Sequence, residues 1–451
     1  MFKIWRNNMA LSGIQIYQLL PKTNCKECGF PTCLAFAMKL AAKQVSLDLC
    51  PDVSEEARAK LAEAAAPPVR PITIKSNGHE VKGGNEVVLF RHKKRFFSPP
   101  GLFIRVYDTQ SADEIKAKVK PVDEYVVDYV GMDLSMGGIA VQANGGDFGA
   151  AVEAVREATK LPLILIGSAG ELKTGLEKLA DDDTPLLCHA TSENWQEMAE
   201  LAKEYDVPLS VAADNVDEMV DLVKKLGDAG LKDFVLAPTQ RSMLGTLTVN
   251  TTIRRMAIQE TFRPLGFPII NFPGDVGDPI REVSLAMQAI GKYGSFIVLD
   301  NFEKATAYAL LVLRANIYTN PQEPIQVTPG IYELNDPGPE DPFLVTTNFS
   351  ITYFSVANEI ESMGIPAWLL VTDSEGMSVL TAWAAGKFDA EIIAKDAKRF
   401  GAPDKVTRKR IILPGHTAVL SGELEEELPD WEVKVGPKEA VDLSAYIKNV
   451  L

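Results

Sequence analysis

The pattern that most constrains the fold is a series of eight short β-branched runs between residues 85 and 320. Amphipathic helical stretches separate most of these runs, which is typical of repeated βα units. Eight strands within about 230 residues predict a TIM barrel, and an open doubly wound sheet is the alternative. The expected strands are LFIRV at 102, IAVQA at 139, PLILI at 162, PLLCH at 185, PLSVA at 208, DFVLA at 233, PIINF at 268 and SFIVL at 295.

A small helical domain is expected before the barrel, over residues 1–66. Ser12 and Gln15 form a capping box that opens a short helix. Two more helices are expected, over residues 33–44 and over residues 54–66, where the proline pair that follows stops the last one.

Two linkers are expected to separate the domains. The first, at residues 67–84, begins with PPVRPITIK and is expected to be extended, and the second, at residues 321–342, is rich in Pro and acidic residues. The barrel then occupies residues 85–320, and a compact Rossmann-like α/β domain occupies residues 343–451. The strands expected in that last domain are FLVTT at 343, WLLVT at 368, RIILP at 410 and WEVKV at 431.

Four of the five cysteines are crowded into residues 25–50, with the spacing C-x2-C-x4-C-x16-C. Such crowding in a cytoplasmic protein favours metal ligation over disulfides. The third cysteine begins a helix, whose free N–H groups and positive dipole end stabilise a thiolate. The spacing, with no histidine among the four, favours a 4Fe-4S cluster that transfers electrons, and structural zinc is the alternative. The expected ligands are Cys25, Cys28, Cys33 and Cys50.

The composition favours a cytoplasmic protein that binds small molecules and other proteins. A formal net charge of −15 would repel nucleic acid and anionic membranes. No apolar stretch approaches the roughly 20 residues of a membrane span, and the N-terminal segment lacks the apolar core of a signal peptide. Cys188, in the apolar run LLCHA, is expected to be a buried structural thiol.

The loops at the carboxyl ends of the C-terminal strands are candidates for a binding site, because open α/β sheets bind ligands there. They are rich in hydroxyls, glycines and helix-start N–H groups, which suit a large ligand that carries amides and a phosphate. Ordinary αβ connections have the same composition, so both interpretations stay open. The loops are TTNFSIT at 346–352, DSEGMS at 373–378, GHTA at 415–418 and GPKEA at 436–440.

The barrel carries no specific motif. GSAG at 167–170 and PGDVGD at 273–278 follow expected strands, where barrel enzymes place functional residues, but a scaffold role fits equally well. GGDFGA at 145–150 does not satisfy the dinucleotide-binding fingerprint.

Taken together, several motifs resemble those of a known family. They are NCKECGFPTCLAFAMKLA with SLDLCP, FRHKKRF at 90, TTNFSITYFSVANEIES, and IILPG with WEVKVGPKEA. Over essentially the whole chain, the sequence resembles the large (gamma) subunit of the corrinoid/iron-sulfur protein of acetyl-CoA synthesis. The resemblance implies a 4Fe-4S domain, a TIM barrel and a C-terminal cobalamin domain.

The resemblance also implies a function and partners. A small barrel subunit would form a heterodimer with this chain and cover the other face of the corrinoid. Cobalt, as Co(I), would take a methyl group from methyltetrahydrofolate on a methyltransferase and deliver it to acetyl-CoA synthase. A reductive activator or a ferredoxin would supply electrons through the cluster to reduce Co(II) back to Co(I). No general acid or base is then required in this chain, because methyl transfer is chemistry of the cofactor.

Carried over by position, the corrinoid-binding residues lie in three of the C-terminal loops. The resemblance directs Ser374 toward the lower axial side of cobalt, where relatives carry a threonine, so the hydroxyl is kept and the methyl group is lost. The expected cobalamin-binding residues are Thr346, Thr352, Ser374, Gly376, Met377, Ser378, Val379, Gly436 and Ala440.

The histidines predict how cobalt is ligated. Many cobalamin proteins ligate cobalt through a D-x-H-x-x-G motif, and none of His79, His92, His189 and His416 fits it. A corrinoid without a histidine lower ligand is therefore expected, which brings reduction to Co(I) within reach of a low-potential cluster. His416 lies in the third loop and is the possible exception. The other functions considered are an electron-transfer activator that holds no corrinoid, and a barrel enzyme with a structural zinc.

Overall fold

A computed structural model describes residues 13–41, 45, 47–54, 57–58, 61, 67–129 and 131–450. The chain divides into two compact units, which are treated separately. One comprises residues 1–126 and 135–318, and the other comprises residues 127–134 and 319–451. No helix among the described residues is both long enough and apolar enough to cross a membrane.

The N-terminal region is helical, as expected. The structure describes α1 (Gly13–Leu19), α2 (Cys33–Ala41) and a 3-10 turn at Leu47–Leu49. Phe36 and Leu61 are almost fully buried in a small core that also contains cysteine side chains. The capping residue Ser12 and the last three residues of the expected second helix lie outside the described residues, as does most of the expected third helix.

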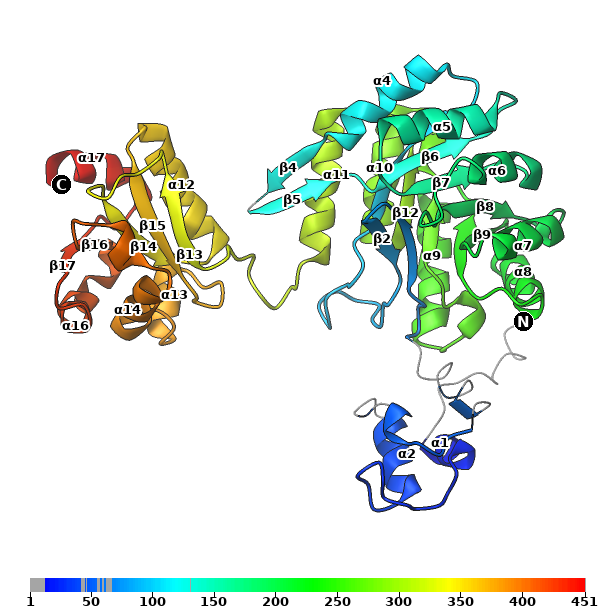
Figure 1. Ribbon diagram of the computed structural model, residues 1–451, viewed down its shortest axis with the longest axis horizontal. Coiled ribbons are helices and arrows are strands. Elements are labelled where there is room, and N and C mark those ends of the chain that lie inside the picture. Colours follow the sequence, from blue (N-terminus) through cyan, green and yellow to red (C-terminus); the bar gives the residue numbers. More distant parts are fainter. Residues whose placement is uncertain are drawn as a thin grey trace. The chain divides into compact units, whose positions relative to one another are not determined.

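The eight expected barrel strands all form, and the TIM barrel is confirmed. They pair side by side in parallel and close in the order β10-β11-β12-β3-β6-β7-β8-β9, with helices outside them (Figure 1). The strands are β3 (Gly101–Tyr107), β6 (Gly138–Gln142), β7 (Leu163–Ile166), β8 (Leu186–Ala190), β9 (Leu209–Ala213), β10 (Phe234–Pro238), β11 (Ile269–Asn271) and β12 (Gly294–Leu299). The helices are α4 (Ala112–Asp123), α5 (Phe148–Ala158), α6 (Ala169–Leu176), α7 (Trp195–Glu204), α8 (Val216–Asp228), α9 (Met243–Ile258), α10 (Pro279–Gly291) and α11 (Lys304–Tyr318).

Two hairpins were not expected from the sequence. β1 (Ile72–Ser76) and β2 (His79–Gly83) pair antiparallel, and Ile72 and Ile74 are buried in the barrel core. Residues 72–83 are therefore a packed part of the barrel, whereas the sequence suggested a linker. β4 (Val126–Tyr129) and β5 (Met132–Ser135) form the second hairpin.

The C-terminal unit is an α/β sheet in which all four expected strands form. Its order is β13-β15-β14-β16-β17, and only β13 is antiparallel to its neighbour. The first parallel strand, β14, has its successors on opposite sides, so the carboxyl ends of β14 and β16 form a topological switch point. The strands are β13 (Gly330–Leu334), β14 (Phe343–Thr347), β15 (Ala367–Thr372), β16 (Arg410–Leu413) and β17 (Glu432–Val435). The helices are α12 (Ser350–Met363), α13 (Val379–Ala384), α14 (Ala390–Arg399), α15 (Ala402–Lys405), α16 (Ser421–Glu427) and α17 (Leu443–Val450), with 3-10 turns η4 (Gly415–Leu420) and η5 (Ala440–Asp442).

The second expected linker is also partly incorporated into a domain. β13 lies within residues 321–342 and pairs with β15 along its whole length. Val327 and Leu334 are buried in the core between the sheet and α12. The packed part of the C-terminal unit therefore begins before residue 343.

Candidate functional site

Three of the four N-terminal cysteines, Cys28, Cys33 and Cys50, lie in one small core. All four are free thiols; Cys33 and Cys50 are buried, Cys28 is half-buried and Cys25 is exposed. Burial raises the pKa of the Cys50 thiol, and the charges of the other three thiolates raise it further, against a hydrogen bond from the backbone of Asp52. Four sulfurs that repel one another as thiolates need a cation between them, so this donor set fits an iron–sulfur cluster.

Asn24 is hydrogen-bonded across the cysteine loop to Cys33, the first residue of α2. Its side-chain oxygen accepts a hydrogen bond from the backbone N–H of Cys33 at 2.8 Å, and its own N–H donates to the Cys33 sulfur at 3.4 Å. Asn24 and Lys26 both have positive φ, as does Gly29, so the loop is tightly wound. Sequence reasoning missed Asn24, although an Asn next to a ligand in a tight loop is a recognisable signal.

The cysteines are not drawn together around a single point. Across the described part of the chain, no group of three or more His, Cys, Asp or Glu side chains is arranged to hold a metal ion. The assignment of the four cysteines as ligands, and the choice between a cluster and zinc, therefore remain predictions.

The second candidate site is the carboxyl edge of the C-terminal sheet. From residue 319 onward, every large apolar side chain that the structure describes as exposed lies at this edge. We call these six side chains the apolar rim; they are Ile351, Leu380, Trp383, Val419, Val435 and Val441. An apolar surface this concentrated marks a binding site on an otherwise acidic unit.

Two polar groups without partners lie at the carboxyl end of β14, in the same sheet. Thr346 and Thr347 end β14, and their side-chain oxygens are buried without a hydrogen-bond partner. A buried hydroxyl without a partner is costly, so such groups commonly await a ligand or water. A ligand that combines an apolar ring with peripheral amides fits this edge.

Asn348 organises the loop that follows β15. Its side-chain oxygen accepts hydrogen bonds from the N–H of Ser374 at 3.0 Å, the hydroxyl of Ser374 at 2.8 Å and the N–H of Gly376 at 2.9 Å. Gly376 has φ +71°, and a Cβ there would meet the Gln326 side chain at 2.6 Å. The loop is thus preorganised by a residue that the sequence analysis did not single out.

Ser374 itself is fully buried. Its hydroxyl is engaged by Asn348, so in this structure it supports the loop and is not displayed at the surface. The axial role expected for Ser374 stays a prediction.

The other expected residues surround the same edge. Thr352 lies in the first turn of α12, Val379 begins α13, and Ala440 begins η5. Gly436 directly follows β17, and a Cβ at Gly415 would meet the Gly436 carbonyl oxygen at 2.6 Å, so the third and fourth loops approach closely. The two remaining residues, Met377 and Ser378, lie in the loop before α13, where Met377 packs against the core and the Ser378 hydroxyl lies 3.0 Å from that of Thr381.

His416 lies beside the fourth loop. Its Nε2 is 3.8 Å from the Glu439 carboxylate, and about a third of its side chain is exposed (34%). This position is compatible with a surface histidine.

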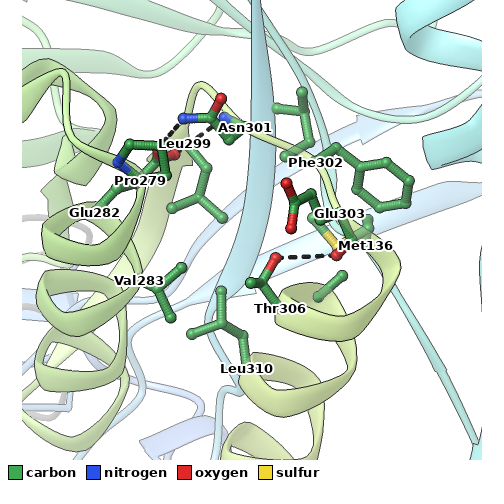
Figure 2. Close-up of a pocket in the computed structure, with 12 residues that line it drawn as sticks. Met136, Pro279, Glu282, Val283, Leu299, Asn301, Phe302, Glu303, Thr306 and Leu310 are labelled. Atoms are coloured by element: carbon green, nitrogen blue, oxygen red, sulfur yellow. Dashed lines mark hydrogen bonds between the residues drawn. The ribbon is translucent and has the colours of Figure 1, made fainter.

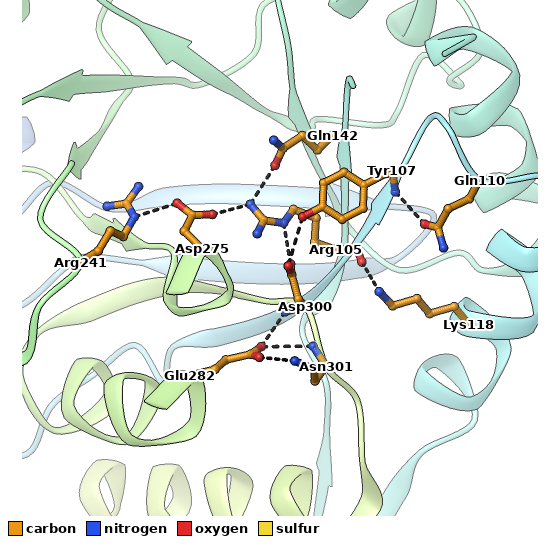
Figure 3. Close-up of polar contacts among 10 residues, drawn as sticks. All are labelled: Arg105, Tyr107, Gln110, Lys118, Gln142, Arg241, Asp275, Glu282, Asp300 and Asn301. Atoms are coloured by element: carbon orange, nitrogen blue, oxygen red, sulfur yellow. Dashed lines mark hydrogen bonds and ion pairs between the residues drawn. The ribbon is translucent and has the colours of Figure 1, made fainter. Parts of the chain in front are cut away.

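The carboxyl mouth of the barrel is filled by a network around Arg105 (Figure 3). Arg105 donates to Asp300 and Asp275, each at 2.6 Å, and to Gln142 at 2.8 Å. Burial opposes the charge of Arg105, but the two carboxylates outweigh it and raise its pKa. Asp275 belongs to PGDVGD and also binds Arg241 at 2.7 Å. PGDVGD therefore contributes Asp275 to the polar network that fills the carboxyl mouth of the barrel.

Two further barrel features also have structural explanations. GSAG supplies Ser168, whose N–H and hydroxyl both donate to Glu171 in a capping box for α6. His189 contacts the Ser210 hydroxyl at 2.7 Å, and burial, aided by the charge of Arg241, lowers its pKa to about 4. His189 is therefore neutral near pH 7.

A pocket beside the barrel mouth is mainly apolar (Figure 2). Its charged groups are Glu282 and Glu303, and the Glu282 carboxylate accepts hydrogen bonds from the N–H groups of Asp300 and Asn301 and from the Asn301 side chain. With the Glu282 carboxylate already engaged, Glu303 is the other charged group of this mainly apolar pocket. Its lining residues are Ile104, Met136, Pro279, Glu282, Val283, Leu299, Asn301, Phe302, Glu303, Thr306, Ala307 and Leu310.

Family models match nearly the whole described chain. Residues 71–447 match a model described as CO dehydrogenase/acetyl-CoA synthase delta subunit. Residues 20–51, which include all four clustered cysteines, match a model described as a putative Fe-S cluster.

Curated relatives match from end to end. The corrinoid/iron-sulfur protein large subunit of Moorella thermoacetica is 44% identical, over 98% of this chain and 99% of its own. The acetyl-CoA decarbonylase/synthase complex subunit gamma of Methanopyrus kandleri is 35% identical, over 97% and 98%. The subunit gamma of Archaeoglobus fulgidus is 34% identical with the same coverage. The relatives include the cysteine segment, which the delta-subunit model does not reach.

Proposed function

Because this chain belongs to the family of the corrinoid/iron-sulfur protein large subunit, the gamma subunit of acetyl-CoA decarbonylase/synthase complexes, we propose that it is a methyl carrier of the acetyl-CoA pathway. It would hold a 4Fe-4S cluster in its N-terminal domain and a corrinoid at the carboxyl edge of its C-terminal sheet. The apolar rim and the unpartnered threonine hydroxyls, which share the carboxyl edge of the sheet, are the observation that carries the corrinoid assignment.

The N-terminal domain would bind the cluster through Cys25, Cys28, Cys33 and Cys50. Cys33 lies at the start of α2, where unpaired N–H groups stabilise a thiolate. Asn24 holds that sulfur in place. The exposed position of Cys25 would bring one edge of the cluster near solvent, where electrons can enter.

The C-terminal edge would bind the corrinoid by two kinds of contact. The apolar rim would pack against the ring and exclude water from one face of it. Thr346, Thr352 and the loop at 374–379 would bind peripheral amides, and the loop at 436–440 would lie beside the tail. Asn348 would keep the second loop in shape before the ligand arrives, which lowers the entropic cost of binding.

The corrinoid would supply a Co(I) nucleophile that accepts a methyl group from methyltetrahydrofolate, and the cluster would supply the electron that reduces Co(II) back to Co(I). The chain's own residues position these groups and do no acid or base chemistry. The partners we propose are a small subunit, a methyltransferase, acetyl-CoA synthase and a reductive activator or ferredoxin. An electron-transfer activator without a corrinoid remains the second candidate, because the cysteine domain alone would serve it.

Metal analysis of the anaerobically purified heterodimer tests this proposal. We expect about four irons and one cobalt per heterodimer, with optical and EPR spectra of both groups. Iron without corrinoid, even after reconstitution with cobalamin, would favour the activator. One zinc in place of iron would contradict both functions.

A charge placed in the apolar rim should weaken corrinoid binding selectively. Leu380 is 46% exposed, and Leu380→Glu would bury a carboxylate against the ring at a cost of about 3 kcal/mol, or about 100-fold in affinity. Equilibrium reconstitution with cobalamin measures this loss, while the iron content should stay unchanged. The matched control is Ile280→Glu, at an apolar position of the barrel that is 79% exposed. Equal cobalamin binding by both variants would contradict the site.

A further inference from the structure

The segment FRHKKRF presents an exposed basic turn on an acidic protein. Between Glu86 and Asp108 the chain has no acidic residue, although 61 of its 451 residues are Asp or Glu. His92, Lys93, Lys94 and Arg95 are all exposed, and we call these four residues the basic turn.

The basic turn is held firmly at its first end. Arg91 donates from Nε to the Ile317 carbonyl and from a terminal nitrogen to the Asn316 carbonyl, both at 2.7 Å. These carbonyls end α11, where a cation is favourable. The Lys93 N–H then closes a turn onto the Phe90 carbonyl at 3.0 Å.

The second end is anchored in the barrel. Phe96 is buried, with its ring centroid 5.6 Å from that of Tyr318. Glu86 accepts hydrogen bonds from the N–H groups of Phe97 and Ser98 at 2.8 and 3.0 Å. Both ends are therefore fixed by buried groups, and the basic turn between them is preorganised.

The cations of the basic turn have no carboxylate partner among the described residues. Within the described part of the chain, Lys93, Lys94 and Arg95 form no ion pair. They lie instead over aromatic faces: Lys93 is 5.9 Å from the Phe90 ring centroid, and Lys94 and Arg95 are 5.1 and 5.7 Å from that of Phe97. Because these cations are unpaired in a protein of net charge −15, they are available to bind an anionic group of another molecule.

From this geometry we propose that the basic turn docks a carboxylate-rich surface of a partner enzyme. A nucleic acid is disfavoured, because its continuous charge would meet the acidic remainder of the chain. A small phosphate compound is disfavoured, because the cations spread over two separate rings instead of converging. A local acidic patch on a protein can match three neighbouring cations and give a transient, salt-sensitive contact.

The docking inference rests on the proposed carrier function, because a carrier must meet its partner enzymes in turn. The test variant Lys93→Gln/Lys94→Gln/Arg95→Gln removes three charges from the basic turn. The control variant Lys160→Gln/Lys225→Gln/Lys395→Gln removes three charges from other exposed positions. Binding of each heterodimer to purified acetyl-CoA synthase and to purified methyltransferase is measured at low and high salt.

For at least one of these enzymes, we expect the test variant to associate about tenfold more slowly at low salt, with a weaker salt dependence, while the control variant behaves as wild type. Zero-length carboxyl–amine crosslinking should join Lys93 or Lys94 to an Asp or Glu of that enzyme. Equal effects of the two variants, or wild-type binding by the test variant to both enzymes, would overturn the inference. Binding of both variants to duplex DNA is measured in the same way, and a loss confined to duplex DNA would also overturn the inference. Cobalt and iron contents, measured on the same samples, report separately on the proposed carrier function.

Discussion

The Cys28→Ala variant should lose reductive repair of cobalt while keeping methyl transfer. Cys28 is one of three thiols whose charge raises the pKa of the Cys50 thiol, and its loss leaves one iron of a 4Fe-4S cluster without a thiolate, which should make the cluster labile and unfit for electron transfer. With Co(I) prepared by a chemical reductant, the variant should still accept and deliver methyl groups at the wild-type rate. Reactivation of Co(II) by a protein electron donor should fall to background. Stopped-flow spectroscopy of the cobalt bands separates the two activities.

Cys188→Ala is the matched control for this experiment. Cys188 is fully buried inside the barrel, and burial raises the pKa of its thiol to about 12. It is therefore a protonated packing residue, as the sequence suggested, and its removal should leave iron content and reactivation unchanged. If Cys28→Ala lost both activities equally with its fold intact, the cluster would not be a separate repair device.

The barrel could be predicted because its information is local and repeated. Each inner strand is a short apolar run, and the two examples LILI at β7 and FVLAP at β10 are buried along their whole length. Eight repeats of one pattern leave few topologies open. The four parallel strands of the C-terminal sheet are recognisable for the same reason.

The segments expected as linkers were misjudged because their pattern resembles that of loops. β13 is half-exposed over most of its length and is surrounded by prolines and acidic residues. Only its antiparallel pairing with β15 makes it a strand. The hairpin β1–β2 likewise follows a proline-rich stretch, and its role appears only where Ile72 and Ile74 enter the barrel core.

The candidate sites were predicted in part. Residue types and spacing singled out the cysteines and the C-terminal loops as candidates, and their roles as ligand-binding residues stay predictions. The supporting residues could not be found this way. Asn348 acts on residues 26 and 28 positions away, and Arg105 is joined to Asp300 across 195 positions. Such partnerships exist only after the chain has folded.

The buried ion pair beneath the basic turn should be among the most sensitive positions of the barrel. Arg254 and Glu86 lie 3.3 Å apart, and their side chains are 6% and 5% exposed. Arg254→Met removes the cation and leaves a buried carboxylate, which should cost about 3–5 kcal/mol near pH 8. Hydrogen exchange of the barrel amides in increasing urea measures this loss for the barrel alone.

The cost of Arg254→Met should depend on pH with a defined sign. Burial already raises the pKa of Glu86, against the opposing charge of Arg254 and hydrogen bonds from the N–H groups of Ser98 and Phe97. Without Arg254 the folded-state pKa rises further above the ordinary value of about 4.3, so the folded chain retains a proton that the unfolded chain releases. The variant should therefore lose stability as pH rises above about 4.3, where the unfolded chain releases this proton, until the raised folded-state pKa is passed.

The double variant Glu86→Gln/Arg254→Met tests whether the unpaired carboxylate of Glu86 causes the loss of stability in Arg254→Met. It removes both charges but keeps a side-chain oxygen that can accept the N–H groups of Phe97 and Ser98. We expect it to be more stable at pH 8 than Arg254→Met alone, and to show no added pH dependence, because no buried carboxylate remains. A double variant as unstable as the single one would mean that packing of Arg254 against Tyr293, and not its charge, stabilises this part of the barrel.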